Sequence, residues 1–393
     1  MKDKFFLILS PSEWSDNAVS NMQISSILSK DYEVVYVETI GTRIPKISEW
    51  RRIFTRLNKF FFSKKTKPSK GLDPLNVKII SPLAIPYHGN FIINKINVIL
   101  ISLQLKKFIK KNNKIYIWSF SPVWENFIET LGTNFRIFHC VDALNTYDNS
   151  KKYQTLLEKS LKCSDLIFTP GVLLEKELKE YNSNTFLVGH GCGHNHIEHK
   201  FKSLPEDIKN LNQDKKIVVY AGTLANWVDY DLFDYLCNSN KEIIFLIIGY
   251  IHPLAPIEKV NNFLKNSNVI HVGYKNYEEL PAYYSVASLG IIPYQSDNQH
   301  IVYSTPTKFL DYFSAGLQTI STNFPAAHEY DGDYVKIANS YEEFSKLIKE
   351  QLLNQSSSSS EKIKKYAKEN SWDNQVQKML NIIEKVENTK QFT

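Results

Sequence analysis

Four apolar stretches in the second half of the chain each end in glycine or proline: IVVYAG at 217–222, EIIFLIIG at 242–249, VIHVG at 269–273 and LGIIP at 289–293. Amphipathic stretches at 230–237, 257–266 and 277–285 predict helices between them. Short apolar runs that alternate with helices are typical of the buried strands of a parallel sheet. Glycine at a strand end lets a ligand approach the backbone at the carboxyl edge of the sheet, where open α/β sheets bind ligands. The second half therefore predicts an α/β domain with a ligand site at that edge.

The first half of the chain repeats this alternation. We expect strands at 4–9, 32–37, 77–80, 115–118, 135–140, 166–169 and 185–188, with helices at 18–28, 96–111, 123–131 and 153–161. A chain of 393 residues exceeds what one hydrophobic core usually serves. We expect domains at 1–200 and 215–371, a polar linker within 198–216, a loop at the serine run 356–360, and a final helix at 372–393 that Ser371 caps.

Charge is concentrated in one segment, although the net charge is only +6. Between Arg43 and Lys70 a single acid, Glu49, accompanies many basic residues, among them Arg51, Arg52, Arg56 and Lys59. Aromatic and aliphatic residues at helical spacing lie among these cations, as in helices that bind anionic membrane surfaces. No recognition motif for nucleic acid accompanies the charge. The four cysteines are widely spaced, and the N-terminal apolar run is short, which favours a cytoplasmic protein. With the basic segment, we expect this protein to associate peripherally with the inner face of the cell membrane.

The block STPTKFLDYFSAG at 304–316 carries the most specific chemistry. Ser304 and Thr305 before a proline predict the start of a helix, whose N-terminus suits a diphosphate. Lys308 would add a positive charge for the same phosphates. Asp311 follows about one turn later, and a carboxylate can accept hydrogen bonds from two neighbouring hydroxyls.

This block, followed by QTIST at 318–322, resembles the donor-site signature of family-4-like glycosyltransferases of the GT-B fold. VYAGT at 219–223, NVIHVGY at 268–274 and, in the first half, FHCVD at 138–142 are similar to further segments of these enzymes, in the same order. The resemblance implies two Rossmann-like domains that face each other across a cleft, with the last helix crossing back to the first domain. It also implies a UDP-sugar donor and a lipid-linked or growing surface glycan (capsule, O-antigen or exopolysaccharide) as acceptor. The donor site would comprise Gly222, Thr223, His271, Gly273, Tyr274, Tyr303, Ser304, Thr305, Lys308 and Asp311, with Asp311 on the ribose.

One departure from that pattern, at two positions, bears on the mechanism. Retaining members carry two glutamates eight residues apart, where this chain has Tyr303 and Asp311. The pattern therefore looks more like the inverting, membrane-associated glucuronosyltransferase branch. Inversion needs a general base, for which Asp142, or else His139, is the candidate. A retaining family-4-type transferase, a sugar-nucleotide epimerase of the same fold and an inactive glycan-binding protein remain alternatives.

Histidine and cysteine gather at HGCGHNH, 190–196. These are zinc-ligand types, but their spacing fits no closed structural zinc site. The resemblance implies instead that the segment is the turn that closes the first domain, with Gly191 and Gly193 as turn glycines. We therefore expect no metal and no cofactor other than the UDP-sugar substrate.

Overall fold

A computed structural model of the chain describes residues 4–15, 19–39, 76–85, 91–109, 114–132, 134–144, 150–198, 201–211 and 214–391. The chain divides into two compact units: Met1–Gly189 with Val376–Thr393, and His190–Gln375. The division precedes the 198–216 stretch in which we expected the linker. The predicted membrane-surface residues Arg51, Arg52, Arg56 and Lys59 lie outside the described residues.

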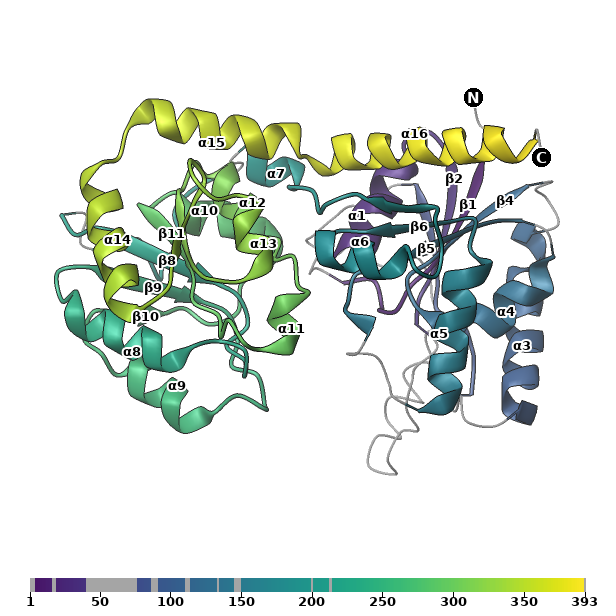
Figure 1. Ribbon diagram of the computed structural model, residues 1–393, viewed down its shortest axis with the longest axis horizontal. Helices are drawn as coiled ribbons and strands as arrows, with labels where there is room; N and C mark the ends of the chain where they lie inside the picture. The colour runs from purple at the N-terminus through teal and green to yellow at the C-terminus, as the bar shows by residue number, and fades with distance from the viewer. Residues whose placement is uncertain are drawn as a thin grey trace. The chain divides into compact units, whose positions relative to one another are not determined.

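A seven-stranded parallel sheet forms the centre of the first unit, in the order β3-β2-β1-β4-β5-β6-β7 (Figure 1). Its strands are β1 (Phe5–Leu9), β2 (Glu33–Val37), β3 (Val77–Ile80), β4 (Ile115–Ser119), β5 (Phe135–His139), β6 (Leu166–Thr169) and β7 (Thr185–Leu187). The helices are α1 (Ser20–Leu28), α3 (Phe91–Ile109), α4 (Glu125–Ile128), α5 (Lys151–Cys163) and α6 (Val172–Leu178), with short 3-10 turns η2 (Pro122–Trp124) and η3 (Glu129–Leu131). The strands are apolar because helices pack on both sheet faces.

The second unit contains a six-stranded parallel sheet in the order β10-β9-β8-β11-β12-β13. Its strands are β8 (Ile217–Ala221), β9 (Ile244–Ile248), β10 (Val269–His271), β11 (Leu289–Ile292), β12 (Thr319–Thr322) and β13 (Val335–Ala338). The helices are α7 (His194–Ile197), α8 (Tyr230–Ser239), α9 (Ile257–Leu264), α10 (Leu280–Tyr284), α11 (Gln299–Val302), α12 (Lys308–Ser314), α13 (Pro325–His328), α14 (Tyr341–Leu353) and α15 (Ser357–Glu369), with the 3-10 turn η5 (Tyr277–Glu279). The order of the strands reverses at β8 and β11, which places a topological switch point between these two strands.

The last helix, α16 (Trp372–Gln391), begins in the second unit and belongs to the first from Val376 onward. Ser371 Oγ accepts a hydrogen bond of 3.3 Å from the Asn374 amide, as expected of a capping residue. Near the other end, Glu387 accepts a hydrogen bond of 2.8 Å from the Tyr116 phenol of β4 and lies 3.6 Å from Lys4 Nζ. The return of the last helix to the first domain is thus confirmed.

The prediction of a loop at the serine run was wrong. Ser356 caps α15 by accepting a hydrogen bond of 3.2 Å from the Ser359 amide, and the following serines form the first turn. A Cβ on Gly316 would lie 2.1 Å from Ser360 Oγ, so the turn after α12 and the start of α15 approach closely. Small side chains on both sides permit this approach, which the composition of the run does not reveal.

Candidate functional site

The switch point of the second unit is bounded by Gly222, which follows β8, and by Tyr294, which lies just beyond β11. Lys308, the first residue of α12, extends toward both. A Cβ on Gly222 would lie 2.2 Å from Lys308 Cε, and Lys308 Nζ lies 5.7 Å from the centroid of the Tyr294 ring. No ion pair involves Lys308 within the described part of the chain. A cation without an acidic partner at this edge is suited to a phosphate ligand.

The neighbouring strand ends are joined by backbone contacts. Gly249, after β9, has a φ of 148°, and a Cβ there would lie 2.0 Å from the Gly222 carbonyl oxygen. Its amide donates a hydrogen bond of 2.8 Å to the Gly273 carbonyl, and its own carbonyl lies 2.8 Å from His271 Nε2. Glycine is required at 249 because both its φ and the close approach exclude a side chain. His271, Gly273 and the half-exposed Tyr274 thus lie at one sheet edge with Gly222 and Thr223.

Asp311 lies about one helical turn after Lys308, and its side chain is buried. Oδ1 accepts a hydrogen bond of 2.9 Å from the Tyr277 phenol. Burial raises the pKa of Asp311 to about 7, although the Tyr277 hydrogen bond and the Lys308 charge both lower it. A buried carboxylate with a perturbed pKa and a nearby cation is a candidate functional group.

Tyr277 is in turn held by the segment that opens the second unit. The His196 ring stacks on the Tyr277 ring at 3.9 Å, and His196 Nε2 lies 2.8 Å from the Tyr277 carbonyl oxygen. The Gly193 amide donates to the Tyr277 phenol oxygen over 3.3 Å, and a Cβ at this glycine would lie 3.0 Å from the Tyr277 ring. His196 Nδ1 is also 3.7 Å from Asp311 Oδ1. The Gly193–His196 turn therefore determines where Tyr277 presents its hydroxyl group.

The predicted start of the phosphate-site helix was wrong by several residues. Helix α12 begins at Lys308, with Thr307 at the N-cap and no capping hydrogen bond from its side chain. Ser304 instead donates its hydroxyl hydrogen to the Ile301 carbonyl over 3.1 Å. Tyr303 is the C-cap of the preceding helix α11, and Thr305 belongs to the connecting loop. These three residues lie in the loop before Lys308 and not on a helix.

His190, the first residue of the 190–196 segment, has structural surroundings. His190 packs edge-on against Trp372 with ring centroids 6.1 Å apart, and burial lowers its pKa to about 4. A Cβ on Gly191 would lie 2.5 Å from the Trp372 Cα, so this glycine permits the close contact. Within the ranges that the structure describes, no group of three or more histidine, cysteine, aspartate or glutamate side chains is placed to hold a metal ion.

The two candidate catalytic residues both lie in the first unit, at and beyond the carboxyl end of β5. His139 is buried, with its ring stacked on that of Phe120 at a centroid distance of 4.9 Å. Asp142, three residues further, is exposed, and its carbonyl oxygen lies 3.5 Å from Cys140 Sγ. Both residues therefore belong to the sheet edge at which open α/β sheets bind ligands.

Comparison with known proteins gives these features a family. Residues 203–370 match the family model described as "Glycosyl transferases group 1". No curated protein sequence matches the chain. Among solved structures, a glycosyltransferase from Rickettsia africae is similar, with a TM-score of 0.68, 13% identity and coverage of 98% of this chain and 99% of that one. Sucrose-phosphate synthase from Thermosynechococcus elongatus gives a TM-score of 0.68 at 14% identity, and the match covers 98% of this chain and 100% of that one. HepE of Anabaena, solved in complex with UDP, gives a TM-score of 0.62 at 11% identity, and the match covers the whole of both chains.

The expected pair of Rossmann-like domains is thus confirmed, and the family match covers the unit that contains Lys308 and Asp311. Residues 203–370 thus match the group 1 glycosyltransferases, and the chain as a whole has the GT-B fold.

Proposed function

We propose that this enzyme transfers a sugar from a UDP-sugar to a glycan or lipid-linked acceptor, with retention of the anomeric configuration. The observation that carries the proposal is the placement of Lys308 and Asp311 about one turn apart on α12, beside the switch point of the sheet in the family-matched unit. Structures of Anabaena HepE with UDP and with UDP-glucose support a uridine donor.

In this proposal Lys308 binds the diphosphate. Its side chain lies over Gly222, where the absence of a Cβ leaves room for the lysine. The charge would stabilise the UDP that leaves as the glycosidic bond breaks, so the scheme requires no divalent metal. The backbone at Gly222 and Thr223 and the loop of Tyr303, Ser304 and Thr305 would contact the phosphates and the sugar.

Asp311 would bind the ribose hydroxyl groups. Tyr277 occupies Oδ1, whereas no described residue forms a hydrogen bond with Oδ2. A carboxylate oxygen has capacity to accept hydrogen bonds from a diol. The uracil would lie at the edge formed by His271, Gly273 and Tyr274, where the half-exposed Tyr274 ring offers a stacking surface.

The group 1 match favours the retaining alternative over the inverting reaction that the missing first glutamate suggested. An inverting displacement needs a side chain that deprotonates the acceptor hydroxyl group. A retaining transfer does not need such a base. Asp142 and His139 would then bind or orient the acceptor, and neither would act as an indispensable base.

The proposal for the acceptor rests on a structurally similar protein and on the basic segment of the sequence. WaaG, which is structurally similar with a TM-score of 0.60 and 12% identity over 96% of this chain and 99% of its own, is a glycosyltransferase involved in lipopolysaccharide biosynthesis. A surface-glycan precursor on a membrane would fit the basic segment that contains Arg51, Arg52, Arg56 and Lys59. Among the described residues, no helix is both long and apolar enough to span a membrane.

Incubation with UDP-sugars that are labelled in the sugar tests the reaction. Transfer to a glycan acceptor supports the proposal, an epimerised nucleotide sugar identifies an epimerase, and donor binding without turnover identifies a binding protein. Proton NMR of the product of an α-linked donor should show an α linkage. Asp142→Asn should retain activity within about tenfold, whereas loss of a true general base costs about 10²- to 10⁴-fold. A β-linked product together with such a loss would establish inversion.

A further inference from the structure

Helix α3 (Phe91–Ile109) is apolar on two opposite sides. Ile101 and Leu105 face inward and are buried in the core of the first unit. On the other side Ile92, Ile96, Ile99 and Leu103 are 66%, 40%, 59% and 62% exposed. At about 100° per residue these four side chains form one continuous stripe along the helix. A helix that is apolar all round is normally covered on all sides, so the outer stripe is a candidate binding surface.

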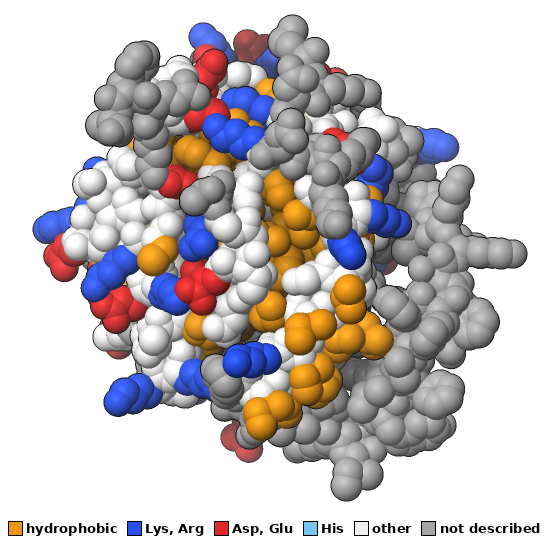
Figure 2. Space-filling view, turned by 90° about the vertical axis from the view of Figure 1, so that its right-hand side faces the viewer, with side chains coloured by type: hydrophobic (Ala, Val, Ile, Leu, Met, Phe, Trp, Pro, Cys, Tyr) orange, Lys and Arg blue, Asp and Glu red, His pale blue; other side chains and the backbone are white. Residues whose placement is uncertain are grey.

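The charges around this stripe have one sign. Lys95, Lys106 and Lys107 are exposed on the same helix, within about 70° of the centre of the stripe. No aspartate or glutamate occurs anywhere between Asp73 and Glu125. Figure 2 shows apolar side chains gathered in a patch on this side of the molecule, with basic side chains at its border.

A groove of about 610 Å³ adjoins the stripe between α3, α4 and α5. Val98, Ile99 and Leu156 give it an apolar lining, and Lys95, Lys152 and Lys159 lie along it. Ile99 belongs to both the groove and the stripe, so the two form one surface. Its ligand must therefore offer hydrocarbon and negative charge side by side.

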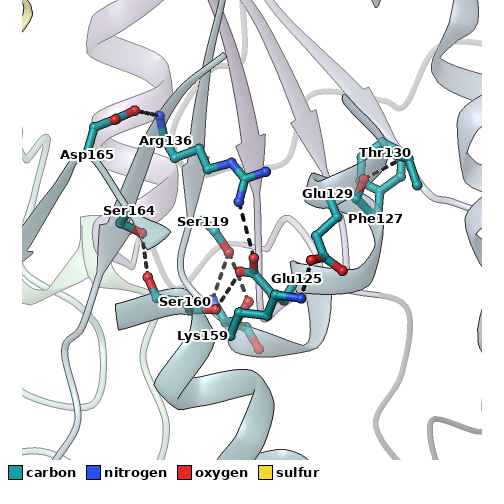
Figure 3. Close-up of polar contacts among 11 residues, drawn as sticks. Ser119, Glu125, Phe127, Glu129, Thr130, Arg136, Lys159, Ser160, Ser164 and Asp165 are labelled. Atoms are coloured by element: carbon teal, nitrogen blue, oxygen red, sulfur yellow. Dashed lines mark hydrogen bonds and ion pairs between the residues drawn. The ribbon is translucent and has the colours of Figure 1, made fainter. Parts of the chain in front are cut away.

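The helices beneath the groove are held together by a polar network (Figure 3). Glu125 of α4 accepts a hydrogen bond of 2.8 Å from the Ser160 hydroxyl of α5 and lies 3.4 Å from Arg136 Nη1. Lys159 pairs with Glu129 at the rim. The groove thus has a fixed floor, and Glu129 at its rim is already paired with a lysine.

We propose that the outer face of α3 and the adjoining groove dock on an anionic lipid bilayer, with the aliphatic stripe in the hydrocarbon boundary and the lysines on the headgroups. Aliphatic side chains bordered by lysine favour a lipid surface over a protein partner, since lysine is depleted in protein interfaces, which are enriched in aromatic residues and arginine. The residues of this surface lie outside the basic segment at 43–70 in the sequence, and the inference does not depend on the donor reaction.

Vesicle sedimentation at low salt tests the proposal with the full-length protein. The probes are vesicles of phosphatidylcholine alone and vesicles with about one third phosphatidylglycerol. Wild type should sediment with the anionic vesicles and much less with the neutral ones. The double variant Ile99→Asp with Leu103→Asp should lose at least about fivefold of that binding, because each aspartate removes apolar contact and adds repulsion.

A matched control is Leu254→Asp with Leu353→Asp, two leucines of the second unit that are 76% and 85% exposed. This control should bind vesicles as wild type does. Both double variants should keep the wild-type melting temperature and UDP affinity, which separates this surface from the donor site. Equal vesicle binding by wild type and the α3 variant would overturn the proposal. A second result would also overturn it. If wild type binds no vesicles and forms a dimer in gel filtration, and the α3 variant is a monomer, then the stripe joins two copies.

Discussion

The phenol of Tyr277 donates a 2.9 Å hydrogen bond to Asp311 Oδ1, and this contact ties the candidate ribose acceptor to the turn at Gly193–His196. The Tyr277 ring cannot shift easily, because His196 stacks on it and the Gly193 amide bonds its oxygen. One carboxylate oxygen is thereby fixed, and no described residue forms a hydrogen bond with the other. In the proposed function Tyr277 is a positioning residue for Asp311.

Tyr277→Phe should weaken UDP binding at pH 7 by about tenfold, the effect expected for losing a hydrogen bond to a charged group. The pKa of Asp311 should rise further, because the lost hydrogen bond lowers it in the native protein. Titration calorimetry at pH 7 and pH 9 measures both effects, and binding should recover at the higher pH. Tyr283→Phe removes another phenol donor to a carboxylate, that of Asp207 at 2.9 Å, and should leave UDP affinity unchanged. Equal affinities in all three proteins would remove the positioning role.

The pKa of Asp311 also predicts how stability depends on pH. Burial raises this pKa from 3.8 to about 7, so the folded protein holds a proton that the unfolded chain has already released. Stability is therefore fully present below about pH 4 and is lost as the pH rises through about 7, by roughly 2 to 4 kcal/mol. Asp311→Asn should abolish this contribution. Between pH 5 and pH 8 the melting temperature of the variant should rise relative to that of wild type. Parallel profiles would contradict the raised pKa of Asp311.

Lys308→Ala should weaken UDP binding by about 10- to 100-fold, as expected for loss of a charged phosphate contact. Binding of uridine, which lacks phosphates, should not change. The control Lys265→Ala removes a lysine at the C-cap of α9 and should leave both affinities at wild-type values. A loss of uridine and UDP affinity in equal measure would place Lys308 away from the diphosphate.

Two glycines of the site should respond differently to alanine. In Gly222→Ala the new Cβ would meet the end of the Lys308 side chain, which can move, so UDP affinity should fall several-fold while the melting temperature changes little. In Gly249→Ala the Cβ would meet the Gly222 backbone at a φ of 148°, so the fold itself should lose about 1 to 3 kcal/mol. Differential scanning calorimetry with UDP titration separates the two effects. A destabilised Gly222→Ala would show that Lys308 is fixed in place.

Most strands could be predicted from the sequence because a buried parallel strand is a continuous apolar run, as at β8 and β9. Strand β13 (VKIA) is short and partly exposed, and it carries no such signal. The seven-residue helix α6 was missed for a similar reason. Helix α15 was hidden by its serine-rich first turn, since only its later residues, such as Ile363 and Ala367, pack on the core.

The site was predictable where its residues are close in sequence. Lys308 and Asp311 belong to one motif, whose resemblance to the donor-site signature already implies phosphate and ribose contacts. Tyr277 lies 34 residues from Asp311, and only the folded sheet brings the two together. The sequence predicts a turn without a metal at the histidine cluster, but it does not predict that His196 stacks on Tyr277. Contacts of this kind depend on tertiary structure and have no pattern in a single sequence.

A titration that compares UDP with its 2′,3′-dideoxyribose analogue is the most direct test of the proposed donor site. For wild type, removal of the two ribose hydroxyl groups should weaken binding by at least about tenfold, since it leaves Oδ2 of the buried Asp311 carboxylate without a hydrogen-bond donor. For Asp311→Ala, UDP and the analogue should bind with nearly the same, reduced affinity. If wild type and Asp311→Ala lose the same factor between the two ligands, or if wild type does not bind UDP, then Asp311 does not hold the ribose and the donor site proposed for this unit is wrong.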